Sequence, residues 1–203
     1  MQLPLRSLTR RALLGAALAA FATGGRTLHA QHDQHAGHGL TVYVVRHAEK
    51  SAEPGADPAL SAAGQARAQA LADSLKSAGV DAVITTQFKR TANTGAVVAQ
   101  AAKLTPVVVG ASADVRTHAA EVAAAVRRQP AGSTVLVVGH SNTVPAIIAA
   151  LGGPRLPDLC DAEYDNLFKL TVPPSGAATM ERSRYGAPAG ADAPGCAQMP
   201  VRK

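Results

Sequence analysis

Short apolar runs and amphipathic stretches alternate along residues 40–184, and this alternation predicts strands that alternate with helices. The apolar runs are rich in Val, which is typical of strands buried on both faces of a parallel sheet. Strands are expected at 41–45, 81–85, 105–109, 134–138, 167–172 and 179–184, and helices at 61–77, 91–102, 114–128 and 143–151. The pattern predicts an α/β fold, a three-layer αβα sandwich around a mostly parallel central sheet, and no second domain.

A basic and then apolar segment precedes the alternating region. Residues 1–30 contain Arg6, Arg10, Arg11, an apolar run at 12–22 and no acidic residue, which is the pattern of a secretory signal peptide. The apolar run is too short to cross about 30 Å of hydrocarbon as a helix. The Arg10-Arg11 pair resembles a twin-arginine export signal, with an ordinary Sec signal as the alternative. Either interpretation predicts a periplasmic or secreted bacterial protein that uses the twin-arginine or Sec export machinery and has no stable membrane anchor.

The rest of the chain divides into three segments. A His-rich flexible arm is expected at 31–39, a single folded domain at 40–185 and a Pro/Gly-rich tail at 186–203. In and beside the arm, histidines recur at intervals of three, at His29, His32, His35 and His38. Such a tract can capture a transition metal. The flanking Gly and polar residues favour a flexible arm instead.

Two cysteines occur in the whole chain, Cys160 and Cys196. An oxidising compartment would permit them to pair and would tie the tail to the folded domain. Two free thiols are the alternative, because the sequence does not place the two Cα atoms.

Composition and charge exclude several classes of function. With 203 residues, 47% of them hydrophobic and 17% charged, the chain is neither disordered nor a polytopic membrane protein. Aromatic residues are 3% and Trp is absent, which argues against a surface that stacks bases. The net charge of +6 belongs mostly to the leader, because 16 basic and 14 acidic residues follow residue 30. We therefore expect no nucleic acid partner.

Histidines and arginines follow three of the predicted strands. Arg46 and His47 come directly after the first strand, Arg90 follows the second, and His140 and Asn142 follow the fourth. The carboxyl ends of parallel strands meet at one edge of a sheet, so these side chains are expected to meet in one crevice. Guanidinium groups match phosphate oxygens bidentately, and a neutral imidazole can attack phosphorus. The set predicts a phosphoryl-transfer site.

These residues, with the Leu-Ser-Ala-Ala-Gly-Gln-Ala segment at 60–66, resemble the histidine phosphatase superfamily, the phosphoglycerate mutase-like clan. The resemblance covers nearly all of residues 40–172 and is strongest to the compact branch of bacterial phosphohistidine phosphatases. It implies a phosphoglycerate mutase-like fold, His47 as the nucleophile, and Arg46, Arg90 and His140 around the phosphate. Asn142 would add a hydrogen bond, and neither a metal nor another cofactor is implied.

The chain departs from the family pattern at two places. Ala48 stands where the family's Arg-His-Gly signature has Gly, a replacement that fits unless the position requires positive φ. The second departure is the general acid that protonates the leaving group in many members. Asp114 is the candidate in the position of the mutase branch, although it could equally cap the third helix. Other candidates are Glu49, Glu163 and Asp165, of which the last two could be solvated acids near a loop end.

The prediction is an exported metal-independent phosphatase that acts through a phosphohistidine on His47. Its substrates would be small-molecule or protein-bound phosphomonoesters or related phosphoryl compounds. A non-catalytic phosphate-binding protein and a phosphoryl mutase are the alternatives. A metal hydrolase that uses His47, Glu49 and His140 is disfavoured because Arg46 and Arg90 would repel a divalent cation. His118, among alanines on a predicted helix, is expected to serve packing or to lie at the surface.

Overall fold

The structure, a computed structural model, describes residues 38–190 and Cys196. Its strands are β1 (Leu40–Arg46), β2 (Val80–Thr85), β3 (Val107–Val108), β4 (Thr134–Gly139), β5 (Asn166–Val172) and β6 (Thr179–Arg184). Its helices are α1 (Ala62–Leu75), α2 (Lys89–Ala102), α3 (Val115–Arg127) and α4 (Thr143–Ala150). The expected export signal and the His-rich arm before His38 lie outside the described residues. No helix in the described part is long and apolar enough to cross a membrane.

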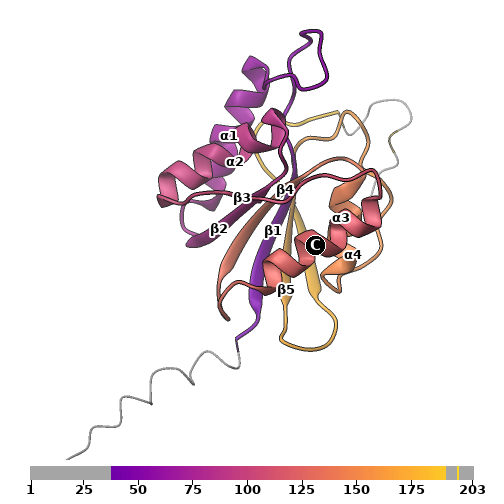
Figure 1. Cartoon of the computed structure of the whole chain (residues 1–203). Helices are drawn as coiled ribbons and strands as arrows, with labels where there is room; N and C mark the ends of the chain where they lie inside the picture. Colours follow the sequence, from indigo (N-terminus) through magenta and orange to yellow (C-terminus); the bar gives the residue numbers. More distant parts are fainter. Residues whose placement is uncertain (1–37, 191–195, 197–203) are drawn as a thin grey trace, which may run out of the picture. The chain divides into compact units, whose positions relative to one another are not determined.

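The six strands form one sheet in the order β3-β2-β4-β1-β5-β6. β1, β2, β3 and β4 are parallel, whereas β5 pairs antiparallel with β1 and β6 pairs antiparallel with β5. Helices α1 and α2 cover one face and α3 and α4 cover the other, which gives three layers (Figure 1). The predicted mostly parallel α/β sandwich is confirmed.

Alternating side chains of the strands divide the core between the two faces. Val42 and Val44 of β1 pack with Val122 of α3 and Ile147 of α4. On the other face, Val45 packs with apolar residues of α1 and α2, including Leu71. The central strands are buried on both sides, which explains why they appear as continuous apolar runs in the sequence.

The third strand is shorter than the sequence predicts. We expected it at 105–109, whereas β3 contains only Val107 and Val108, which pair with Ile84 and Thr85 of β2. Pro106 has no N–H to donate to a ladder. The strand also lies at the edge of the sheet, where one neighbour is missing. Its two valines remain exposed.

The structure bears on the expectations for the two cysteines and for His118. Cys160 and Cys196 are joined in a disulfide, with their Cα atoms 5.2 Å apart. His118 is buried in α3, and its Nδ1 lies 3.0 Å from the carbonyl oxygen of Gly110. It serves packing, one of the two roles expected for it.

Candidate active site

The segment after β1 is held by hydrogen bonds to α2 and β4. The N–H of His47 donates to Gly139 O at 2.9 Å, and the N–H of Ala48 donates to the Thr94 hydroxyl at 2.9 Å. Ala48 is fully buried and packs against Leu60. Its φ is negative, since Lys103 is the one non-glycine residue with positive φ in the described ranges. Alanine therefore fits the position that the family fills with glycine.

Glycine at position 64 lets helix α1 approach this segment closely. A Cβ at Gly64 would collide with the carbonyl oxygen of Glu49. Ser61 caps the helix by accepting the Gly64 N–H at 3.1 Å, and its own N–H donates to Glu49 O at 2.9 Å. The Leu-Ser-Ala-Ala-Gly segment thus fixes the backbone that follows His47.

His47 has one ring nitrogen in a hydrogen bond and one that is available for chemistry. Nδ1 lies 2.8 Å from the carbonyl oxygen of Ala48. Because a carbonyl only accepts, this bond places the proton on Nδ1 and the lone pair on Nε2. Burial lowers the pKa of His47 to about 4, against the raising effect of the Ala48 hydrogen bond, and Arg46 and Arg90 lower it further. The imidazole is neutral at pH 7.

His140, at the end of β4, faces His47. The two ring centroids are 5.4 Å apart, with the planes inclined by 65°. A hydrogen bond of 3.2 Å joins His140 Nε2 to the Thr86 hydroxyl, and the backbone N–H of His140 donates to the Thr143 hydroxyl. Burial, followed by the neighbouring His47 and Arg90, lowers the pKa of His140 to about 3. Thr86 was not among the predicted site residues, although its place directly after β2 was a usable signal.

Arg46 is buried at the end of β1 and is held by the loop between α4 and β5. Its Nη1 donates to Cys160 O at 2.8 Å and to Glu163 O at 3.3 Å. Its guanidinium carbon lies 4.2 Å from the centre of the Tyr164 ring, a cation–π contact. The loop therefore orients the plane of the guanidinium.

Arg90, in the first turn of α2, is the second guanidinium of the site. It stacks over Phe88 at 4.3 Å and lies 3.8 Å from the carboxylate of Asp57. Burial and the neighbouring Arg46 lower the pKa of Arg90 from its usual value, against the opposing effect of Asp57. The two arginines thus contribute positive charge to the same small volume.

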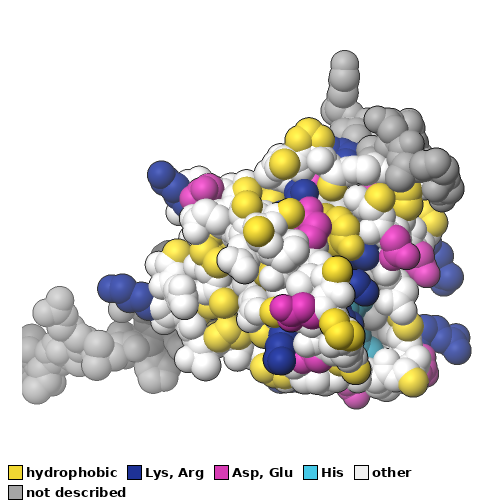
Figure 2. Space-filling view, turned by 90° about the horizontal axis from the view of Figure 1, so that it is seen from above, with side chains coloured by type: hydrophobic (Ala, Val, Ile, Leu, Met, Phe, Trp, Pro, Cys, Tyr) yellow, Lys and Arg dark blue, Asp and Glu magenta, His cyan; other side chains and the backbone are white. Residues whose placement is uncertain are grey.

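The predicted nucleophile His47 and three of the predicted phosphate-binding residues line one pocket of about 410 Å³, the three being Arg46, Arg90 and His140. Lys50, Asn142 and Asp161 also line it. Viewed toward the carboxyl edge of the parallel strands, histidine atoms are visible in a hollow beside basic side chains (Figure 2). The pocket can hold a tetrahedral oxyanion between two guanidiniums and two neutral imidazoles.

Asn142 lies at the start of α4. Its side chain makes no capping hydrogen bond to the helix. It borders the pocket, so its amide is placed to reach a bound oxyanion. Its hydrogen bond to a bound phosphate stays a prediction.

Asp114 is outside the pocket. Its neighbours Ala113 and Val115 line the pocket, but the Asp114 carboxylate caps α3 and accepts from Arg116 N at 2.9 Å and from the Thr117 hydroxyl at 2.9 Å. These hydrogen bonds lower the pKa of Asp114. Its assignment as a catalytic acid is corrected, because an exposed capping carboxylate neither faces the site nor holds a proton.

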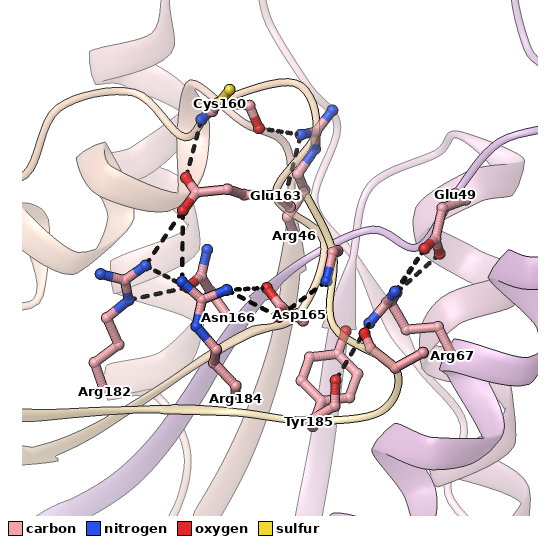
Figure 3. Close-up of polar contacts among 12 residues, drawn as sticks. Arg46, Glu49, Arg67, Cys160, Glu163, Asp165, Asn166, Arg182, Arg184 and Tyr185 are labelled. Atoms are coloured by element: carbon pink, nitrogen blue, oxygen red, sulfur yellow. Dashed lines mark hydrogen bonds and ion pairs between the residues drawn. The ribbon is translucent and has the colours of Figure 1, made fainter. Parts of the chain in front are cut away.

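The other candidate acids are occupied in ion pairs (Figure 3). Glu49 accepts from Arg67 at 2.7 Å. Glu163 lies between the N–H of Cys160, at 3.2 Å, and Arg182, at 3.4 Å. Asp165 pairs with Arg184 at 2.7 Å and is buried. Glu163 and Asp165 are therefore not solvated acids. Asp161, which does line the pocket, was not among the sequence candidates.

No group of three or more His, Cys, Asp or Glu residues in the described part of the chain could hold a metal ion. Three of the four histidines in the tract beside the export signal, at 29, 32 and 35, lie outside the described residues. The pocket itself combines its imidazoles with arginines, whose positive charge favours an anion over a cation.

Part of the chain matches a known protein family. Residues 42–112 match the sequence profile described as "Histidine phosphatase superfamily (branch 1)". The curated proteins contain no match.

Solved structures share the fold at low identity. The chain is similar to the protein histidine phosphatase SixA complexed with tungstate, with 20% identity, 71% of this chain and 96% of that chain covered, and a TM-score of 0.56. It is also similar to a SixA described as a phosphohistidine phosphatase from Agrobacterium tumefaciens, with 23% identity, 73% and 98% covered, and a TM-score of 0.52. A mycobacterial glucosyl-3-phosphoglycerate phosphatase matches with 17% identity, 72% and 98% covered, and a TM-score of 0.54.

Proposed function

We propose that this chain is a member of the histidine phosphatase superfamily and an exported, metal-independent phosphatase that works through a phosphohistidine on His47. Its substrates are phosphomonoesters or related phosphoryl compounds. The observation that carries this proposal is the geometry of His47. Its Nδ1 is bound to Ala48 O, and its Nε2 is available in a pocket with Arg46, Arg90 and His140.

The proposed reaction has two steps. In the first, the His47 Nε2 lone pair forms a bond to phosphorus while the bond from phosphorus to the ester oxygen breaks. In the second, a water oxygen attacks phosphorus, the bond to Nε2 breaks and inorganic phosphate leaves. Nucleophilic catalysis of this kind divides one difficult displacement into two easier ones.

The remaining residues stabilise charge on the transferred group. Arg46 and Arg90 donate hydrogen bonds to the phosphoryl oxygens, and their positive charge opposes the growing negative charge of the transition state. The neutral imidazole of His140 has one N–H to donate. The hydrogen bond to Thr86 holds its ring orientation.

The neighbouring surface supports a substrate with a sizeable leaving group. A second groove of about 440 Å³ shares Val115 and Asn142 with the phosphate pocket. Its walls are mainly apolar, with Pro145 and Leu156 among them. We propose that the leaving group extends into this groove, since the groove and the pocket share Val115 and Asn142.

Export is proposed from the leader, which lies outside the described residues. The disulfide between Cys160 and Cys196 supports this proposal, because such bonds persist in oxidising compartments and are rare in the bacterial cytosol. The periplasm, or the medium for a secreted protein, is such a compartment.

The proposal is tested by hydrolysis of p-nitrophenyl phosphate in the presence of EDTA. We expect the wild-type protein to hydrolyse this ester with the chelator present, and brief mixing with labelled substrate to leave acid-labile phosphate on the protein. His47→Ala removes the nucleophile, so we expect at least a 10³-fold loss of kcat and no label.

His38→Ala is the matched control, because it removes an exposed histidine that precedes β1, whereas the pocket lies at the carboxyl end of that strand. This variant should retain full activity. A phosphate-binding protein without turnover, an activity lost with EDTA and restored by zinc, or a label that survives in His47→Ala would each contradict the proposal.

A further inference from the structure

One carboxylate reaches the phosphate pocket among the described residues, and it belongs to Asp161. Its side chain is 97% exposed, and its Oδ1 lies 3.4 Å from Arg46 Nη2. Asp161 shares the pocket lining with His47 and His140. The carboxylate therefore lies beside the guanidinium that is proposed to hold a phosphoryl oxygen.

The backbone that carries Asp161 is fixed although its side chain is exposed. Asp161 is the second residue of a turn in which Glu163 N donates to Cys160 O at 2.9 Å. Cys160 O also accepts from Arg46 Nη1 at 2.8 Å, and its Sγ is in the disulfide to Cys196. The turn is thus tied to Arg46 by a hydrogen bond and to Cys196 by the disulfide.

The other acids near the pocket are held elsewhere. Arg67 holds Glu49 through both carboxylate oxygens, at 2.8 and 2.9 Å from its Nε. Glu163 is buried against Arg182, and the carboxylate of Asp57 accepts the N–H of Lys89 at 2.9 Å. Moving one of these carboxylates into the pocket would separate it from the group that holds it, at a cost in free energy.

We propose that Asp161 is the general acid that protonates the leaving group, an inference that rests on the proposed phosphatase function. The phosphate replaces the Asp161 carboxylate at Arg46, and the displaced carboxyl group then lies beside the leaving-group oxygen. As the bond from His47 Nε2 to phosphorus forms, the bond from phosphorus to the ester oxygen breaks and that oxygen takes the Asp161 proton. The Asp161 carboxylate then accepts a proton from the water that attacks the phosphohistidine.

This role makes a prediction that depends on the leaving group. p-Nitrophenolate leaves readily without a proton, whereas an alkoxide has a high pKa and requires one. In Asp161→Asn we expect kcat/KM for butyl phosphate to fall about 10²-fold and kcat/KM for p-nitrophenyl phosphate to change less than about threefold. Asp161→Glu, which keeps the acid, should restore part of the loss for butyl phosphate.

Asp57→Asn is the matched control, because it removes a carboxylate beside the other phosphate-site arginine, Arg90. Its effect on the two esters should be equal. An equal loss for both esters in Asp161→Asn would overturn the general-acid role, and so would unchanged hydrolysis of butyl phosphate. A wild-type protein that cleaves only the aryl ester would also overturn it while leaving the phosphatase proposal standing. The absence of a phosphoenzyme in the wild type would instead refute the phosphatase proposal itself.

Discussion

The two imidazoles of the pocket are kept neutral by burial and by each other. His47 is 5% exposed, and protonation of either ring would place a third cation beside Arg46 and Arg90. A neutral His47 retains a lone pair for the proposed attack on phosphorus, and the bond from Nδ1 to Ala48 O aims that lone pair away from the backbone. The arginines that are proposed to bind the anion thus also favour the neutral form of the proposed nucleophile.

This arrangement predicts a loss of stability in mild acid. The folded pKa values of His47 and His140, about 4 and about 3, lie below the unfolded value near 6.5. The unfolded chain therefore takes up protons first as the pH falls. The free energy of unfolding should be fully retained above about pH 6.5 and should decrease toward pH 4 by up to about 1.4 kcal/mol per pH unit for each histidine.

Thermal unfolding between pH 7 and pH 4 measures this effect. His47→Asn should show a shallower decrease of Tm than the wild type, while His38→Asn should match the wild type because His38 is exposed. Identical curves for wild type and His47→Asn would show that His47 is protonated as easily in the folded protein as in the unfolded chain.

The loop between α4 and β5 connects the disulfide to the phosphate site. Leu159 N donates to Ser141 O, next to His140, and the carbonyl oxygens of Cys160 and Glu163 accept from Arg46. The disulfide attaches Cys196 to the same loop. An element without regular secondary structure thus determines how one of the phosphate-binding arginines is oriented.

Removing the disulfide should weaken phosphate binding. In the variant with Cys160→Ser and Cys196→Ser, we expect the inhibition constant of inorganic phosphate to rise about tenfold, which is the loss of roughly one well-oriented hydrogen bond to a charged group. Dithiothreitol should produce the same change in the wild-type protein and no further change in the double variant. An inhibition constant that is unaffected by both treatments would show that the loop keeps its place without the disulfide.

The parallel sheet brings distant parts of the chain into one site. Arg46 ends β1, whereas Arg90 follows β2 and His140 follows β4. These three strands are neighbours in the order β2-β4-β1. Because these strands run in the same direction, their carboxyl ends meet at one edge. The antiparallel pair β5 and β6 extends the sheet on the other side of β1 and brings the β5 end of the Asp161 loop close to Arg46.

For the whole protein, the leader predicts a twin-arginine export route. Replacing Arg10 and Arg11 with Lys should leave the protein in the cytoplasm, because this pathway reads the arginine pair. Cell fractionation and immunoblotting would measure the distribution, with Arg6→Lys as the control outside the pair. Undiminished export of the double-lysine variant would favour the Sec route, and cytoplasmic wild-type protein would refute export.

The sequence alone predicted the fold class and the four residues of the phosphate pocket. Strand and helix periods are local properties, so the alternation of Val-rich runs with amphipathic stretches is visible without a structure. Ligands bind at the carboxyl ends of parallel strands, and this rule predicts a site made of the residues there, namely Arg46, His47, Arg90 and His140. The length of β3 was overpredicted, because it depends on a missing neighbour and on Pro106 and not on hydrophobicity.

The candidates for the general acid could be distinguished only by the tertiary structure. Residue type and local position do not distinguish the candidate carboxylates, since each lies near a strand end, a helix start or a loop. They are Glu49, Asp114, Asp161, Glu163 and Asp165. Their fates depend on partners far away in the chain, since Glu49 meets Arg67 and Glu163 meets Arg182. The sequence determined which groups meet at the carboxyl ends of the strands, because backbone direction places them. Only the tertiary contacts distinguished the carboxylates from one another, because ion pairing depends on distances that local patterns do not contain.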